Sequence, residues 1–108
     1  MSKTLKELIS MCQDMAQAKG FPLKNYPVQL LRMHSEVSEA FQALSKLPSG
    51  SYEGTESLEA AVKYREELAD LAITLLAHCG GNDIDLEGEM ERKLAYNKMR
   101  PHLHGKAF

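Results

Sequence analysis

A nearly unbroken apolar run at residues 68–77 sets strict conditions on how this chain folds. The run consists of Leu68, Ala69, Leu71, Ala72, Ile73, Leu75, Leu76 and Ala77. A helix of this composition has almost no polar face, and a helix that is apolar all round is buried all round. A chain of 108 residues has too small a core to cover such a helix on every side. We therefore expect the helix to pack against a partner subunit as well, most simply in a C2 homodimer.

The residue types of the whole chain favour helices over strands. Val, Ile and Thr contribute only three residues each, whereas Leu contributes 15 and Ala and Glu contribute 11 each. Strands draw on β-branched residues, and helices draw on Leu, Ala and Glu. The fold class is therefore predicted to be all-α.

Apolar residues at helical spacing, together with capping and breaking residues, predict four helices. The expected helices cover residues 4–19, a segment from Pro27 through Leu44, a segment from Thr55–Ser57 to Cys79, and a segment from Asp83 or Asp85 to Met99. Thr4 and Glu7 form a capping-box pattern at the first start. The loop at residues 47–54 is expected to be mobile. We predict one domain over residues 1–108, a four-helix bundle-like subunit with a basic tail at residues 100–108, completed by oligomerisation.

Charge and cysteine usage exclude several classes of protein. The formal net charge is −2, from 13 Lys plus Arg against 15 Asp plus Glu, which argues against a nucleic-acid polymer as partner. No apolar run approaches the ~20 residues that span a bilayer, and the first residues lack the apolar core of a signal peptide. Cys12 and Cys79 have no CxxC spacing, so we expect a reduced, cytoplasmic protein without membrane contact.

Two segments repeat the same pattern of acids and apolar residues. Glu36-Val37-Ser38-Glu39-Ala40-Phe41 and Glu67-Leu68-Ala69-Asp70-Leu71-Ala72 both read acid, aliphatic, small, acid, apolar, apolar. Acids at positions i and i+3 share one face of a helix, and in both segments they flank the apolar stripe. If the two stripes pack together, the four carboxylates converge.

Converging carboxylates repel each other unless a cation lies among them. Asp70 interrupts the apolar run, so we expect it to be buried, where an unpaired carboxylate costs several kcal/mol. Oxygen ligands alone suit Mg²⁺, or Mn²⁺, rather than Zn²⁺. The alternative, a solvated helix face, remains open for Glu36 and Glu39. A di-iron site is excluded, because no Glu stands three residues before any His.

The last predicted helix carries a cationic face. Lys93, Asn97 and Arg100 follow one another at i, i+4 and i+7, with Tyr96 beside them. One interpretation is a favourable macrodipole arrangement, with acids first and bases last. The other is a phosphate clamp, in which lysine acts as a point charge and arginine as a fork. Acids and cations together indicate a magnesium-bound polyphosphate.

These motifs resemble the MazG-like, all-α nucleoside triphosphate pyrophosphohydrolases. The family motif E-x-x-E, spacer, E-x-x-D corresponds to Glu36-x-x-Glu39 and Glu67-x-x-Asp70. The longer strings HSEVSEAFQAL, REELADLAITLLA and KLAYNKMRPHLHGK, at residues 34–44, 65–77 and 93–106, are also similar, whereas Ser35 stands where many members carry an acid. The resemblance covers residues 30–108 and implies a MazG-like bundle that assembles as a homodimer or homotetramer.

The resemblance also implies an activity and a site. It implies Mg²⁺-dependent hydrolysis of an NTP or dNTP to the monophosphate and pyrophosphate, with water attacking the α-phosphorus. Glu36, Glu39, Glu67 and Asp70 would be catalytic metal ligands, and Lys93, Tyr96, Asn97 and Arg100 would bind the nucleotide. Two alternatives stay open: a non-enzymatic helical assembly protein, and the same site acting on another phosphorylated metabolite. Candidate stacking groups for the base are Phe21, Tyr26, His34, Tyr52 and Tyr64.

Overall fold

The computed structural model describes residues 2–46 and 58–100, and in these ranges it contains four helices and no strand. The helices are α1 (Leu5–Ala18), α2 (Tyr26–Leu44), α3 (Leu58–Gly81) and α4 (Leu86–Met99). The all-α prediction is therefore confirmed. The predicted loop at 47–54, the predicted start of the third helix and the tail beyond residue 100 lie outside the described residues.

Capping residues define the helix ends close to their predicted positions. The Thr4 side chain accepts from the backbone N–H of Glu7 and the Glu7 carboxylate accepts from that of Thr4, so the predicted capping box is present. Asn25 caps α2, and Asp85, one of two predicted residues, caps α4. Gly20 follows α1 with a φ of +74°, a left-handed conformation that glycine adopts without a Cβ penalty.

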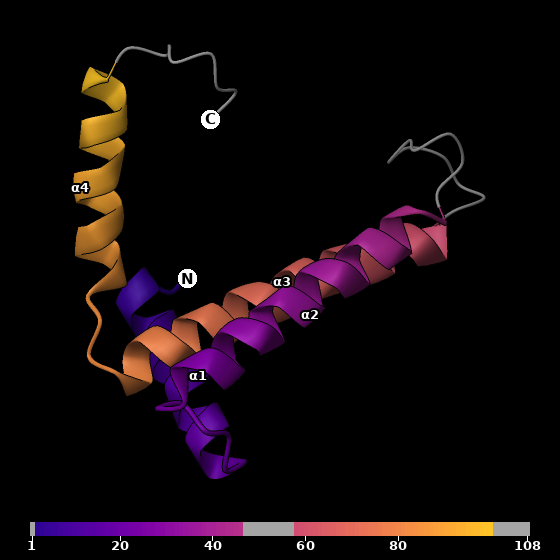
Figure 1. The fold of residues 1–108 in the computed structure, drawn as a ribbon, viewed down its shortest axis with the longest axis horizontal. Helices are drawn as coiled ribbons and strands as arrows, with labels where there is room; N and C mark the ends of the chain where they lie inside the picture. Colours follow the sequence, from indigo (N-terminus) through magenta and orange to yellow (C-terminus); the bar gives the residue numbers. More distant parts are fainter. Residues whose placement is uncertain (1, 47–57, 101–108) are drawn as a thin grey trace.

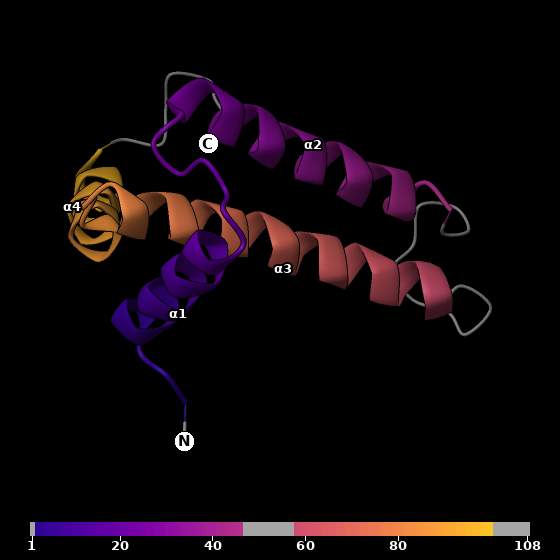
Figure 2. The same cartoon turned by 90° about the horizontal axis from the view of Figure 1, so that it is seen from below.

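The longest helix, α3, is the centre of the fold. Figure 1 and Figure 2 show α2 lying alongside α3 in the antiparallel direction, while α1 crosses the C-terminal half of α3. The small side chains of Ala40 and Ala43 on α2 and Ala61 on α3 are buried, which lets the two helices approach closely. A second cluster forms where α1 meets α3, from Cys12, Ala16, Leu23 and Ala77 with Ile73 and Leu76 packed against it.

The connection between α1 and α2 is fastened to the C-terminal end of α3. The Asn82 amide donates to the carbonyl oxygens of Leu23, at 2.7 Å, and His78, at 2.9 Å. The Lys24 ammonium donates to the carbonyl oxygen of Gly81 at 3.0 Å. A Cβ on Gly81 would lie 2.7 Å from a methyl carbon of Leu23, so glycine permits this close contact. Helix α3 ends at Gly81, two residues beyond its predicted end at Cys79.

Helix α4 stands apart from the packed body. It leaves the C-terminal end of α3 and points away from the α2–α3 pair (Figure 1). None of its residues is buried, and Met90 and Leu94 expose large apolar side chains. Apolar residues of this kind also remain exposed on α3, where Leu68 keeps 42% of its surface and Leu75 keeps 37%. One subunit thus leaves part of the apolar run uncovered. Among the described residues, no helix is long and apolar enough to cross a membrane.

We predict that Asn82→Asp lowers the free energy of unfolding by about 1–3 kcal/mol, because a carboxylate oxygen then faces two carbonyl oxygens without a proton to donate. A chemical denaturation curve measures this change. Asn25→Asp is the matched control. Its side-chain oxygen only accepts from the Val28 N–H, and aspartate caps a helix as well as asparagine does. Equal losses in both variants would contradict the role assigned to Asn82.

Candidate functional site

Three of the four predicted acids converge in the middle of the α2–α3 pair. One carboxylate oxygen from each of Glu36, Glu67 and Asp70 lies within 4.8 Å of the other two. Glu36 reaches this point from α2, and the other two acids reach it from α3. The antiparallel pairing brings the two sequence motifs together, as their repeated pattern predicted. Glu39 is not in this closest group, although its carboxylate influences the pKa of both Glu36 and Glu67.

The buried acid of this cluster is Glu67 and not, as expected, Asp70. Glu67 exposes only 3% of its surface, whereas Asp70 is exposed and Glu36 is partly buried. The reason is rotational. Glu67 is on the same side of α3 as Thr74 and His78, which face the interior, and Asp70 lies about 60° around the helix from it. The apolar run around Asp70 in the sequence predicts that Asp70 is buried. In the structure, part of that run is itself exposed, and Asp70 is exposed with it.

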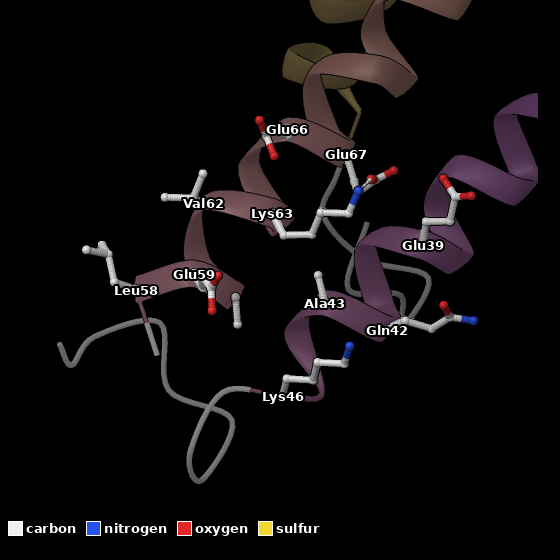
Figure 3. A pocket seen from close by; sticks show the side chains of 11 residues that line it. Glu39, Gln42, Ala43, Lys46, Leu58, Glu59, Val62, Lys63, Glu66 and Glu67 are labelled. Atoms are coloured by element: carbon white, nitrogen blue, oxygen red, sulfur yellow. Dashed lines mark ion pairs between the residues drawn. The ribbon is translucent and has the colours of Figure 1, made fainter. Parts of the chain in front are cut away.

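A single lysine compensates part of the acidic charge. Lys63 Nζ lies 2.7 Å from Glu67 Oε1, one helical turn away (Figure 3). This ion pair holds the pKa of Glu67 below its usual range, and it raises the pKa of Lys63. Burial, followed by the nearby carboxylates of Glu67, Glu39 and Asp70, raises the pKa of Glu36 to about 7. The positive charge of Lys63 therefore does not balance the negative charge of the carboxylates that meet at this point.

The donor set fits a hard divalent cation. Glu36 Oε2 and Glu67 Oε2 are buried oxygens without a hydrogen-bond partner, which is costly unless a ligand satisfies them. Mg²⁺ binds oxygen at about 2.0–2.1 Å, so opposite ligands of one ion lie about 4.2 Å apart. The observed spread of up to 4.8 Å is wider, so the three side chains would have to move closer together to hold one ion. Carboxylates without imidazole or thiolate favour Mg²⁺ or Mn²⁺.

The acid cluster separates two pockets. The larger one, about 1200 Å³, lies between the C-terminal half of α2 and the N-terminal half of α3. Glu39 and Glu67 line it together with Lys46 and Lys63 (Figure 3). Its other lining residues are Gln42, Ala43, Leu58, Glu59, Ala60, Val62 and Glu66. This pocket combines carboxylates with cations, as a site for a metal-bound phosphate chain requires.

The smaller pocket, about 260 Å³, lies on the other side of the cluster. Glu36 and Asp70 form one part of its wall, and its remaining lining residues come from α1, the α1–α2 connection, α2 and α3: Met15, Ala16, Lys19, Phe21, Leu23, Gln29, Arg32, Ile73, Thr74 and Ala77. Six of its twelve lining residues are apolar and six are polar, and the cations Lys19 and Arg32 line it together with the two acids.

The four predicted nucleotide-binding residues on α4 are near one another but not near the acids. The Tyr96 ring lies between two cations, with Lys93 Nζ at 5.0 Å and Arg100 Cζ at 5.3 Å from its centroid. Asn97 is exposed on the same helix. Because α4 leads away from the α2–α3 pair, a single subunit does not bring this cationic face to the acid cluster (Figure 1).

The sequence motifs do not point to three further side chains of the site, Lys63, Gln29 and Arg32. Helical spacing in the sequence could have indicated two of them. Gln29 lies seven residues before Glu36 and Lys63 lies four residues before Glu67, so each shares a helix face with an acid. Among the candidate stacking groups, Phe21 lines the smaller pocket. Tyr26 instead packs edge-on against His78, at 4.8 Å between centroids, His34 is exposed, and Tyr52 lies outside the described residues.

We predict that Glu36→Gln stabilises the metal-free protein at pH 8 and not at pH 4. A carboxyl whose pKa rises from 4.5 to about 7 on folding contributes stability below pH 4.5 that is lost as pH rises through 7. Glutamine removes this loss, and we expect Tm at pH 8 to rise by about 4–8 °C, which corresponds to about 1 kcal/mol. Thermal melts in a chelating buffer measure it, with Glu66→Gln as control. An unchanged Tm at pH 8 would contradict the crowding of these acids.

Comparisons with known proteins identify no relative of the chain. No protein-family model matches it, and neither a search of curated proteins nor a search of solved structures finds a significant match. The resemblance to the MazG-like family therefore rests on the acidic motifs and the segment at residues 93–106.

Proposed function

We propose that the protein is a Mg²⁺-dependent hydrolase that converts a nucleoside triphosphate, NTP or dNTP, to the monophosphate and pyrophosphate. The observation that carries this proposal is the convergence of Glu36, Glu67 and Asp70 at the border of two pockets. The uncompensated acids provide a place for a cation. Both pockets place cations beside the acids, and the smaller one adds the apolar side chains of Phe21, Ile73 and Ala77, which supports a ligand with a phosphate chain and a ring.

The metal would be held by Glu36, Glu67 and Asp70, with Glu39 at the edge of the group. When bound, Mg²⁺ neutralises negative charge on the phosphate oxygens and orients the phosphate chain. The chain's own groups provide the rest. Lys46 and Lys63, which line the larger pocket, are counter-charges for the departing pyrophosphate. Glu39 is exposed beside Glu67, and its carboxylate can accept the proton of the water that attacks the α-phosphorus.

A second copy of the chain is part of the proposal. On α2 the apolar side chains of Leu30, Val37 and Phe41 are exposed. They lie about 80–120° around the helix from the buried Gln29. On α3, the exposed Leu68, Ala72 and Leu75 lie about 80–140° from Glu67 in the same rotational sense. Because the two helices are antiparallel, equal rotations of the same sense reach the same side of the pair. The two stripes therefore form one apolar surface, which we propose as the dimer interface.

Dimerisation also offers a role for α4. The cationic face of Lys93, Asn97 and Arg100 does not reach the acids of its own subunit, so α4 of another copy is the natural source of these groups. A homodimer or homotetramer would then bring cations and acids to one nucleotide, and the phosphate clamp remains a proposal that depends on this assembly. We propose the cytoplasm as its location, since both cysteines are free thiols, as in a reducing compartment.

Two alternatives are distinguished by ligands. A non-enzymatic assembly protein would use the exposed apolar surface and would show no effect of Mg²⁺ or nucleotide on Tm. A hydrolase for another phosphorylated metabolite, such as a phosphoribosyl compound, would retain the metal site but prefer that metabolite over dNTPs. The crowding of acids argues against the first alternative, because an assembly role gives no reason for the buried Glu67.

We predict that the protein releases pyrophosphate from at least one NTP or dNTP in the presence of Mg²⁺. Glu67→Gln and Asp70→Asn should each lower the rate by at least about 100-fold, because each removes one charge from the metal site. A coupled pyrophosphate assay with a panel of nucleotides measures both the activity and the preferred base.

Asp14→Asn is the matched control for this experiment. Asp14 is an exposed carboxylate on α1 that lines neither pocket, so its substitution should leave the rate within about twofold. Pyrophosphate release that persists in Glu67→Gln, or a complete absence of release from every nucleotide, would overturn the proposed function.

We predict that Phe41→Lys dissociates the oligomer, because it inserts a charge into the proposed apolar surface. Leu31→Lys is the control. The two side chains are exposed to a similar extent, 68% for Phe41 and 66% for Leu31, but Leu31 lies outside the surface. Light scattering after gel filtration gives the mass of each variant. A wild-type protein that is monomeric at micromolar concentration would contradict the interface.

A further inference from the structure

We propose that Gln29 recognises the base of the nucleotide by hydrogen bonds, in the smaller pocket beside the acid cluster. The inference rests on the proposed function and adds to it the residue that selects the base. It starts from a polar side chain that the fold of the chain leaves without a partner.

Gln29 is the most deeply buried polar residue among those described. Its exposed fraction is 0%, and neither Nε2 nor Oε1 has a hydrogen-bond partner. A buried amide without partners costs about 1–3 kcal/mol, and such a group calls for a ligand or a functional reason.

The position of Gln29 relative to the acids suits a nucleotide. Gln29 precedes Glu36 by seven residues, so the two side chains lie on the same face of α2, about 10.5 Å apart along the helix axis. Both line the smaller pocket, as does Asp70. A nucleotide with its phosphates at the acid cluster can extend its sugar and base along this face towards Gln29.

Part of the pocket wall suits a flat ring, and the rest of the lining includes the charged side chains of Lys19, Glu36 and Asp70. Ile73 and Ala77 of α3 supply aliphatic surface, and Phe21 supplies an aromatic ring. The Arg32 guanidinium carbon lies 4.3 Å from the centroid of Phe21, so a cation–π pair forms part of the lining. Aromatic and guanidinium planes are the groups on which proteins stack bases. The volume, about 260 Å³, is near the lower limit of small-molecule pockets, about 300 Å³.

The chemistry of the amide explains why the ligand is a base and not merely an apolar ring. Glutamine presents one donor and one acceptor side by side, and the edge of a nucleobase presents the complementary pair. An apolar ring would leave the amide unpaired in a dry pocket. A pocket that hydrogen-bonds its substrate in this way discriminates strongly against ligands that lack the matching groups.

Binding of free nucleosides to the full chain, without metal, tests this inference. Saturation-transfer NMR at millimolar concentration compares the common nucleosides with wild type, Gln29→Leu and Gln42→Leu. We expect at least one nucleoside to bind, with an affinity at least about tenfold lower in Gln29→Leu and unchanged in Gln42→Leu. Gln42 is the matched control because it lies on the same helix but lines the larger pocket. We also expect Gln29→Leu to raise Tm, since leucine removes an unpaired amide.

The outcomes separate this inference from the proposed function. Nucleoside binding that depends on Gln29, with no hydrolysis of any triphosphate, would overturn the proposed function and support the base pocket. Hydrolysis with the same ratio of KM values across the bases in wild type and Gln29→Leu would support the function and overturn the role of Gln29. A lower Tm in Gln29→Leu, or the absence of nucleoside binding to wild type, would also overturn it.

Discussion

Electrostatic repulsion among carboxylates is the constraint that connects the packing of α2 and α3 to everything else in this protein. The small residues Ala40, Ala43 and Ala61 let the two helices pair closely. That pairing brings acids from both helices within 4.8 Å of each other, at a place where Glu67 is almost fully buried. One lysine at 2.7 Å compensates only part of the charge. The arrangement is costly for the folded chain alone, and a bound cation would lower that cost.

The location of the cluster gives this electrostatic feature its chemical meaning. A patch of acids on an open surface would only be solvated, but these acids form the border between two pockets. Both pockets have cations in their lining, and the smaller one also has the unpaired amide of Gln29. Under the proposed function, the phosphates would lie in the larger pocket and the base in the smaller one.

Sequence reasoning was most successful where local chemistry decides the structure. The capping box of Thr4 and Glu7 and the cap at Asp85 depend on residues three positions apart, so they were predictable from spacing. The convergence of the acids was also predictable, because the repeated motif places them at the edges of two apolar stripes. The burial of individual acids was not. It depends on the rotation of α3 against α2, and this rotation buries Glu67 and exposes Asp70.

The sequence by itself determined the four helices of the described chain, the capping box of Thr4 and Glu7 and the pairing of two acidic motifs, because these follow from periodicity and short-range hydrogen bonding. Only the tertiary structure decided which atoms remain without partners. Gln29 is an ordinary polar residue in the sequence, and it becomes an unpaired amide only because three helical segments close around it. The direction of α4, which leads away from the acids, is also a property of the tertiary structure. None of the residues of α4 is buried, so its few apolar side chains do not hold it against the other helices of the same chain. Burial depends on how the helices pack against one another, and the spacing of residues along the chain does not determine that packing.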